Sequence, residues 1–149
     1  MHHSAKPAQV TLTRASVHRV PSTKARLIRI ALPAYWGALA FATHYPRVRI
    51  PGEIPDSDKL VHFAAFGLLA LLFWLFRTGV RPLTARDVWI AAAVLIAYAT
   101  LDEYTQQFVG RYTDVADWIA NLTGIITVLV VLEVRRRVRA SAGRARSRD

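Results

Sequence analysis

Hydrophobic residues in this chain gather into four long blocks, which are separated by stretches rich in charged residues. The blocks cover residues 27–45, 60–76, 88–109 and 115–134. Each holds roughly 20 residues, the number that an α-helix needs to cross the hydrocarbon core of a bilayer. Apolar residues follow one another within a block instead of alternating with polar ones, which favours helices over strands. The pattern predicts an all-α, polytopic membrane protein with four transmembrane helices in an antiparallel bundle.

The block at residues 60–76 shows most clearly that lipid is the expected surrounding. Its only residues outside the apolar set are His62 and Gly67. A helix that is apolar on every face has no side suited to water. Hydrophobic residues also make up 53% of the 149 residues, which is high for a soluble domain with a large excess of positive charge.

Basic residues are unevenly divided among the segments between the blocks. Most of the 20 lysines and arginines lie in residues 1–29, 77–86 and 135–148. Loops rich in lysine and arginine stay in the cytoplasm when a membrane protein inserts. We therefore expect both termini to be cytoplasmic, with residues 46–59 and 110–114 on the outer side of the membrane.

The two ends of the chain differ from the blocks in composition. We expect residues 1–26 to be a disordered basic cytoplasmic tail, residues 27–134 to form the membrane domain, and residues 135–149 to be a second basic cytoplasmic tail. Residues 140–149 lack apolar periodicity, which predicts disorder there as well. Clustered arginine is typical of nucleic-acid binding, but arginine directly after a spanning helix is expected to contact anionic lipid. We expect no nucleic-acid partner.

A secretory signal peptide is an alternative interpretation of the first block. A basic stretch, an apolar run and the small residues Ala38 and Ala40 follow in the order that is found in such a leader. However, Pro33 and Gly37 interrupt the apolar run. We expect the first block to be retained as a helix, whereas cleavage after it would leave three spans.

Polar residues in the other three blocks cluster at the end that the topology places on the outer side. A charged side chain inside a spanning helix costs about 3 kcal/mol unless it faces the bundle interior or a wet cavity. We therefore expect these residues to share one outward-facing polar pocket. The candidates are Asp58, Lys59, His62, Asp102, Glu103, Gln107, Arg111, Asp117 and Asn121.

Spacing supports a shared pocket because residues four apart lie on one face of a helix. Asp58 and His62 are four apart, and so are Glu103 and Gln107. The short connection at residues 110–114 places the last two helices next to each other as a hairpin. Two glycines, Gly67 and Gly124, are expected to let helix backbones approach closely, as small residues do between membrane helices.

Three motifs occur in order between residues 58 and 124, in about half of the chain. They are Asp58-Lys59-Leu60-Val61-His62-Phe63, then Asp102-Glu103 with Gln106 or Gln107, then Gly110-Arg111 followed by Asp117, Asn121 and Gly124. In these residues the chain resembles the VanZ-like family of small bacterial membrane proteins, named after a protein associated with resistance to the glycopeptide teicoplanin. The resemblance implies an integral protein of the bacterial cytoplasmic membrane with a role in the cell envelope. It implies no agreed reaction, substrate or cofactor.

Three functions are open for the predicted pocket. Its residues can be structural, because hydrogen bonds between membrane helices stabilise a bundle by about 0.6 to 2 kcal/mol each. They can bind an envelope ligand such as a lipid headgroup, a peptidoglycan fragment or a glycopeptide, with Arg111 holding a phosphate or carboxylate. They can also activate water in a membrane hydrolase or transferase that uses Glu103, His62 and Asp117.

The sequence narrows the chemistry of the enzymatic alternative. The chain has no cysteine, so a disulfide scaffold, a thiolate metal site and a cysteine nucleophile are excluded. A single histidine among the pocket candidates, with dispersed carboxylates, gives little support for a metal ion, and we expect neither a metal nor another cofactor. A homo-oligomer is compatible with the sequence.

Overall fold

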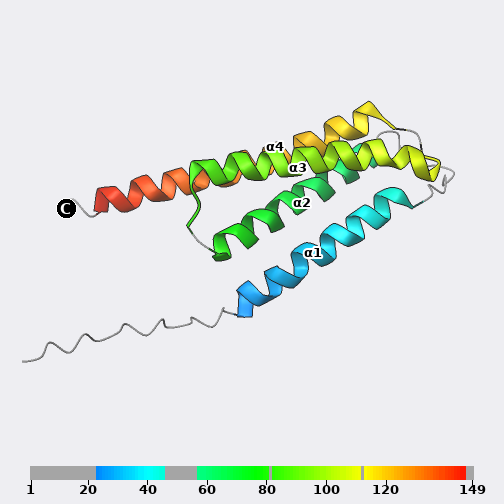
Figure 1. Ribbon diagram of the computed structural model, residues 1–149. Coiled ribbons are helices and arrows are strands. Elements are labelled where there is room, and N and C mark those ends of the chain that lie inside the picture. The colour runs from blue at the N-terminus through cyan, green and yellow to red at the C-terminus, as the bar shows by residue number, and fades with distance from the viewer. Residues whose placement is uncertain (1–22, 46–56, 81, 112, 147–149) are drawn as a thin grey trace, which may run out of the picture.

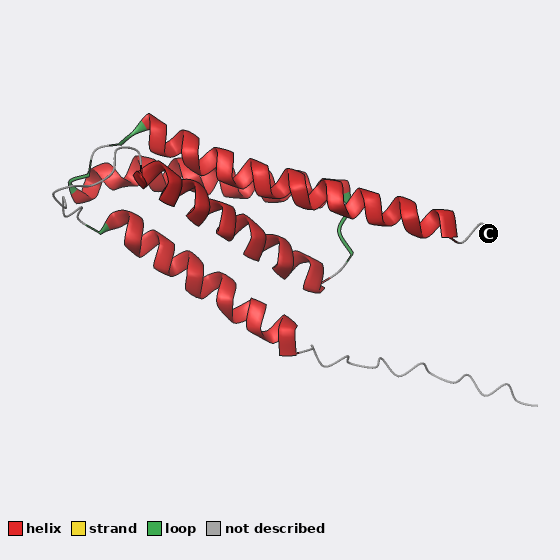
Figure 2. Cartoon of the chain, turned by 180° about the vertical axis from the view of Figure 1, so that it is seen from behind, coloured by secondary structure: helices red, strands yellow, loops and turns green. Residues whose placement is uncertain are grey.

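The chain forms four α-helices and a short 3-10 turn in the parts that the structure, a computed structural model, describes: residues 23–45, 57–80, 82–111 and 113–146 (Figure 1). The elements are α1 (Thr23–His44), α2 (Ser57–Val80), α3 (Ala85–Gln106), η1 (Gln107–Val109) and α4 (Val115–Arg146). All regular structure in these parts is helical (Figure 2), which confirms the all-α prediction.

The helices extend beyond the hydrophobic blocks at both ends of the membrane domain. Helix α1 begins at Thr23, inside the segment predicted to be a disordered tail. Helix α4 continues to Arg146, so the prediction of disorder for residues 140–149 is corrected for residues 140–146. The physical reason is that arginine and alanine are strong helix formers, and a helix that continues out of an apolar block needs no apolar face of its own to begin.

Three helical segments are long and apolar enough to cross a membrane, within the described ranges: Ser57–Val80, Ala85–Val109 and Val115–Arg146. Helix α1 is not among them. The outer surface of the bundle is rich in large apolar side chains; Leu60 is 69% exposed and Trp89 is 76% exposed. Exposed apolar side chains in this number suit contact with lipid. The chain is therefore a helical multi-pass membrane protein.

The ends of the helices meet at two opposite ends of the molecule. We call the "site end" the place where the last turns of α1 and α3 meet the first turns of α2 and α4; there Thr43 bonds Asp102 and Glu103 bonds Asp114. We call the opposite end, which includes residues 77–87 and 132–146, the "tail end". Figure 1 shows the start of α1 and the C-terminal part of α4 on the tail-end side.

Helices α2 and α4 form the most extensive contact in the molecule, and two glycines make it possible. A Cβ atom added to Gly124 would lie 3.0 Å from the carbonyl carbon of Phe63 and closer still to its oxygen. A Cβ atom added to Gly67 would lie 3.4 Å from Val128. The predicted close approach of helices at these glycines is confirmed. Below them, Phe66, Leu69, Leu95 and Ile125 form the fully buried apolar core.

A capping box begins α3 at the tail end. The backbone N–H of Thr84 donates to Asp87 Oδ2 over 2.8 Å, and the Asp87 N–H donates back to the Thr84 hydroxyl. Arg77 of α2 donates to the other Asp87 oxygen over 2.6 Å. This exchange satisfies the free N–H groups of the first helical turn and fixes the turn between α2 and α3.

Candidate functional site

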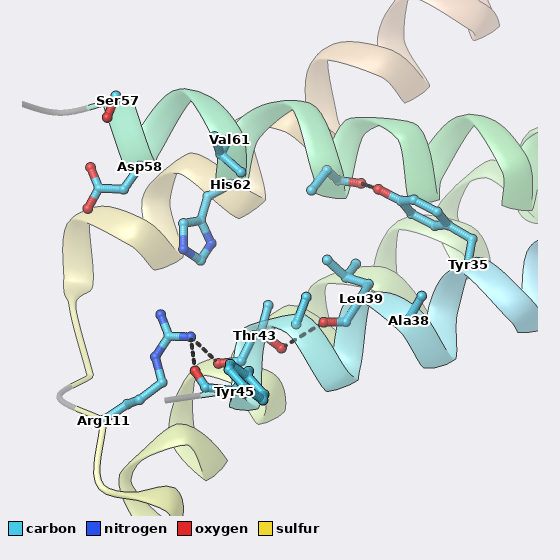
Figure 3. Close-up of a pocket in the computed structure, with 12 residues that line it drawn as sticks. Tyr35, Ala38, Leu39, Thr43, Tyr45, Ser57, Asp58, Val61, His62 and Arg111 are labelled. Carbon is cyan, nitrogen blue, oxygen red and sulfur yellow. Dashed lines mark hydrogen bonds between the residues drawn. The ribbon is translucent and has the colours of Figure 1, made fainter. Parts of the chain in front are cut away.

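A cavity of about 540 Å³ lies between α1 and α2 at the site end (Figure 3). Polar side chains surround its outer part, where Asp58 and His62 of α2 face Arg111 across the opening. Its inner part is apolar and runs along the two helices past Leu39 and Val61. The full lining is Tyr35, Ala38, Leu39, Ala42, Thr43, Tyr45, Ser57, Asp58, Val61, His62, Ala65 and Arg111. The cavity is therefore amphipathic along its length.

His62 forms part of the cavity wall and is held from behind by α4. Its Nδ1 atom lies 3.0 Å from Asn121 Oδ1, and its Nε2 atom lies 3.5 Å from Asp117 Oδ2. All three side chains are buried, and Asn121 is fully inaccessible. Two contacts from one helix face fix the plane of the imidazole ring, because Asp117 and Asn121 are four residues apart.

Arg111 reaches the cavity from the connection between α3 and α4. Its Nη1 atom donates to the carbonyl oxygen of Thr43 over 2.5 Å and to that of Tyr45 over 3.4 Å. Carbonyl groups at the end of a helix lack partners within the helix, so the guanidinium caps α1. Gly110 makes this position possible, because its φ of 76° lies in the left-handed region that glycine adopts without strain.

Asp58 and Lys59 lie in the first turn of α2. Asp58 Oδ1 accepts the backbone N–H of Lys59 over 2.9 Å and lies 3.5 Å from the Lys59 ammonium group. Asp58 lines the cavity, whereas Lys59 is not among the lining residues. The carboxylate therefore stands at the mouth of the cavity with a positive charge beside it.

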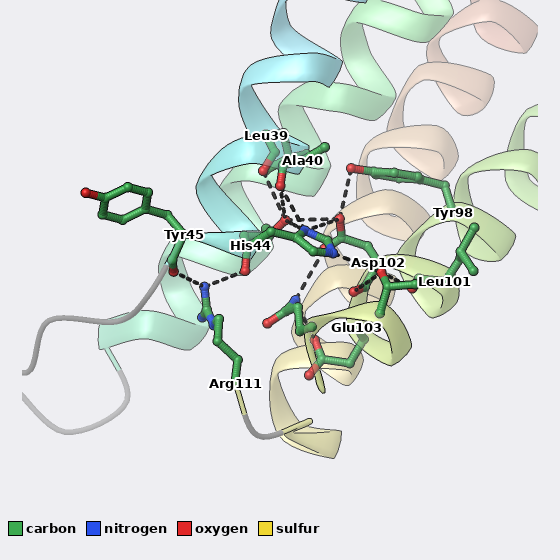
Figure 4. Close-up of polar contacts among 12 residues, drawn as sticks. Leu39, Ala40, His44, Tyr45, Tyr98, Leu101, Asp102, Glu103 and Arg111 are labelled. Carbon is green, nitrogen blue, oxygen red and sulfur yellow. Dashed lines mark hydrogen bonds and ion pairs between the residues drawn. The ribbon is translucent and has the colours of Figure 1, made fainter. Parts of the chain in front are cut away.

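Asp102 is the centre of a second, closed polar network (Figure 4). Thr43 of α1 and Tyr98 of α3 donate their hydroxyl groups to Asp102 Oδ1 over 3.0 and 3.1 Å. Gln106 donates to Oδ2 over 3.3 Å, and His44 Nδ1 lies 3.8 Å from Oδ1. Because Asp102 is only 3% exposed, this carboxylate joins α1 to α3 and does not face a ligand cavity.

Glu103 joins α3 to α4 in the same network. Its Oε1 atom accepts the backbone N–H of Asp114 over 2.7 Å, just before α4 begins. Its Oε2 atom accepts a hydrogen bond of 3.4 Å from Gln106. Since Glu103 is 6% exposed, it holds the start of α4 in place and has little contact with the surface.

Gln107 is placed differently from the sequence-based expectation. It is exposed, belongs to the 3-10 turn, and donates to the carbonyl oxygen of Tyr104 over 2.8 Å. Gln106 takes the inward position and is 2% exposed. The helical spacing from Glu103 does not continue to Gln107, because α3 ends at Gln106 and the backbone tightens there.

The nine candidate residues therefore lie at one end of the molecule but do not line one pocket. Three of them, Asp58, His62 and Arg111, line the cavity between α1 and α2. The candidates on α3 and α4 that point inward are buried: Asp102, Glu103, Asp117 and Asn121. Lys59 and Gln107 lie outside both groups.

Several residues that build the site end were not among the sequence candidates. Thr43 and His44 end the first hydrophobic block, and His44 Nε2 lies 2.9 Å from the Thr105 hydroxyl. Their position at the outer end of a block was the available signal. Tyr98 carried a weaker signal, since it lies one helical turn before Asp102. Within the described ranges, histidine and carboxylate residues form no group of three that could hold a metal ion.

Comparison with known proteins identifies one relationship. The family model described as VanZ/LLP1 matches residues 8–136, which confirms the resemblance seen in the sequence motifs. No curated protein and no solved structure matches the chain.

Proposed function

This chain belongs to the VanZ/LLP1 family, and from that premise we propose that it is a bacterial envelope protein that binds an amphiphilic ligand between α1 and α2. The observation that carries the proposal is the cavity of about 540 Å³, which is polar at its outer end and apolar along the helices. A ligand with a polar headgroup and a hydrocarbon chain matches this division, because each of its parts then meets groups of similar polarity.

The proposal places four helices across the bacterial cytoplasmic membrane, with the site end outside and both termini in the cytoplasm. Helix α1 is the fourth span. Its retention is supported by two contacts with the other helices: the Tyr35 hydroxyl donates to the carbonyl oxygen of Ala65 of α2 over 2.9 Å, and the Thr43 hydroxyl donates to Asp102 of α3. The arginine-rich end of α4 then lies on the cytoplasmic side, as the distribution of basic residues favours.

Charges around the opening indicate the chemistry of the headgroup. The guanidinium of Arg111 carries five N–H donors, of which those on Nη1 donate to the carbonyl oxygens of Thr43 and Tyr45. Its remaining donors suit a phosphate or carboxylate. Asp58 and the His62 ring on the opposite wall suit hydroxyl or amine groups of the same headgroup. Lipid headgroups, lipid-linked peptidoglycan fragments and glycopeptides all combine such groups.

Small side chains on both helices leave room for the apolar part of the ligand. Ala38 and Ala42 of α1 face Ala65 of α2 along the cavity. Ala38 and Ala42 are exposed, so a larger side chain there fills the cavity without disturbing the core. This makes the apolar half of the proposal testable by itself.

Binding is tested with full-length protein in a neutral detergent, using dodecyl phosphate as the probe and dodecanol for comparison. Native mass spectrometry measures the bound fraction. Ala38→Leu fills space that the hydrocarbon chain would occupy and is expected to weaken dodecyl phosphate binding about tenfold. Arg111→Gln removes the positive charge and is expected to weaken binding about tenfold or more, since a charged hydrogen bond is worth about 1.5–3 kcal/mol. Ala34→Leu, on α1 but outside the cavity lining, is the matched control.

Thermal unfolding of each variant separates lost binding from lost structure. The proposal requires that Ala38→Leu unfolds at the temperature of the wild type while its binding is reduced. It is abandoned if Ala38→Leu and Ala34→Leu bind the probe equally. Teicoplanin tolerance is the physiological extension of the proposal; bacteria that depend on this protein for tolerance should lose it with either cavity variant.

A second candidate is a water-activating hydrolase or transferase that acts on the same ligand. It is favoured by one observation: His62 lines the cavity while Asp117 contacts the far side of its ring. In this candidate His62 accepts a proton from a water molecule as the water oxygen bonds to a phosphorus or carbonyl carbon of the ligand. The ester bond to the leaving alcohol breaks, and His62 returns the proton to the alcohol oxygen. Glu103 bonds the Asp114 backbone, so the base is His62. His62→Gln would then abolish turnover and retain dodecyl phosphate binding.

A further inference from the structure

A second cavity, of about 430 Å³, lies between α2 and α4 at the tail end. It is far from the proposed ligand cavity, because its residues belong to the last two turns of α2, the connection just before α3 and the arginine-rich part of α4. Its lining is Trp74, Thr78, Pro82, Leu83, Leu132, Arg135, Arg136 and Arg139.

The arginines of this cavity carry more positive charge than the neighbouring carboxylate can balance. Glu133 accepts hydrogen bonds from Arg136 over 2.7 and 2.8 Å and from Arg137 over 2.6 Å. Its two oxygen atoms are therefore already engaged. Arg135 and Arg139 have no hydrogen bond or ion pair with any residue in the described part of the chain.

Arg135 and Arg139 are four residues apart on α4, so their side chains are neighbours on one helical face. Like charges at this spacing destabilise a helix. An anion bound between the two guanidinium groups attracts both of them and so offsets their repulsion. Guanidinium groups bind phosphate oxygens with well-aligned hydrogen bonds.

The apolar part of the cavity indicates which kind of molecule carries the anionic group. The Trp74 side chain is 7% exposed and lies next to Leu132 and Leu83. These residues occupy the boundary between the apolar core of the bundle and its basic end. A molecule that meets them together with Arg135 and Arg139 presents a phosphate at the membrane surface and hydrocarbon below it. Basic cavities between membrane helices bind lipid headgroups in this way.

We infer that the tail-end cavity binds a phosphate group between Arg135 and Arg139, supplied by the headgroup of an anionic phospholipid. The site is independent of the ligand cavity at the site end. It holds the protein at the surface of the leaflet where the arginine-rich end of α4 emerges.

The test titrates the full-length Arg111→Gln protein with phosphatidylglycerol, phosphatidylcholine or inorganic phosphate and counts bound molecules by native mass spectrometry. The Arg111→Gln background removes the charge of the other cavity. Arg135→Gln combined with Arg139→Gln is expected to weaken phosphatidylglycerol binding about tenfold or more, at roughly one kcal/mol for each arginine. The matched control combines Arg144→Gln with Arg146→Gln, which removes the same charge from the exposed end of the same helix.

Saturable binding of phosphatidylglycerol that is lost only with the 135/139 pair supports the site and its lipid source. Saturable binding of inorganic phosphate with the same dependence supports the phosphate site and changes the source to a free anion. Equal losses in the two double variants, or equal binding of phosphatidylcholine and phosphatidylglycerol, overturn the inference. Because all four arginines concerned are exposed on α4, these substitutions leave the packing of the bundle unchanged.

Discussion

Hydroxyl and amide donors surround the buried Asp102 carboxylate from two helices. The contact from Thr43 spans α1 and α3, while those from Tyr98 and Gln106 come from α3 itself. Burying a carboxylate is costly unless its oxygens are hydrogen-bonded. The donors around Asp102 provide this compensation, so the network stabilises one arrangement of α1 against α3.

Removing one donor from this network is predicted to destabilise the protein. Tyr98→Phe deletes the hydroxyl that donates to Asp102 but keeps the ring, which packs against Trp36 and Phe66. We expect the free energy of unfolding to fall by about 1.5–3 kcal/mol, the value of a hydrogen bond to a charged group. The measurement is reversible unfolding in mixed detergent micelles.

The control for this prediction is Tyr104→Phe on the same helix. Tyr104 is 58% exposed, so the loss of its hydroxyl is expected to change the free energy of unfolding by less than about 0.5 kcal/mol. Equal effects of the two substitutions would show that Asp102 does not depend on the Tyr98 hydroxyl.

At the scale of the helices, the contact between α2 and α4 depends on Gly124. Gly124→Ala would place a Cβ atom against the carbonyl group of Phe63. Since the obstacle is backbone, the helices must separate, and we expect a loss of about 1–3 kcal/mol or more in the free energy of unfolding. The displaced α2 would also carry His62 away from Asn121 and weaken the proposed ligand binding.

Gly143→Ala is the matched control, since Gly143 belongs to the same helix and has no atom near the added Cβ position. Alanine is the better helix former, so this variant should be as stable as the wild type or slightly more stable. The same denaturation measurement compares both variants. A Gly124→Ala protein with wild-type stability would contradict the close packing of α2 on α4.

At the scale of the whole molecule, the orientation in the membrane can be tested with single cysteines. The chain has no native cysteine, and Thr113 at the site end and Ser141 near the C-terminal end of α4 are both exposed. In intact spheroplasts, a membrane-impermeant maleimide should label Thr113→Cys and should not label Ser141→Cys. Permeabilised cells should show labelling of both.

The reverse labelling pattern would place the ligand cavity on the cytoplasmic side and would remove the proposed access to envelope ligands. Labelling of both positions in intact spheroplasts would contradict a crossing of the membrane by α4, because the two positions lie at opposite ends of that helix. An intact-mass measurement on the same purified proteins tests the retention of α1, because cleavage after the first block would lower the mass. Such cleavage would also remove one wall of the cavity.

Hydrophobic patterning by itself determined that the chain is helical, that it contains segments able to cross a membrane, and that its polar residues gather at one end. These properties follow from the composition of contiguous segments and from helical spacing, which are local. The motifs around His62, Glu103 and Arg111 also sufficed to indicate the family. The exact ends of α1 and α4 were not determined, because helices continue through polar residues when no signal stops them.

Only the tertiary structure decided how the polar residues are divided. Spacing along a helix cannot show that Asp102 and Glu103 are satisfied by Thr43 and the Asp114 backbone, because those partners are far away in the sequence or belong to the main chain. Nor can it show that α1 closes a cavity against α2, since a cavity exists only between packed helices. The division into a closed network and an open cavity depends on the mutual position of the helices, which the packing at Gly124 fixes.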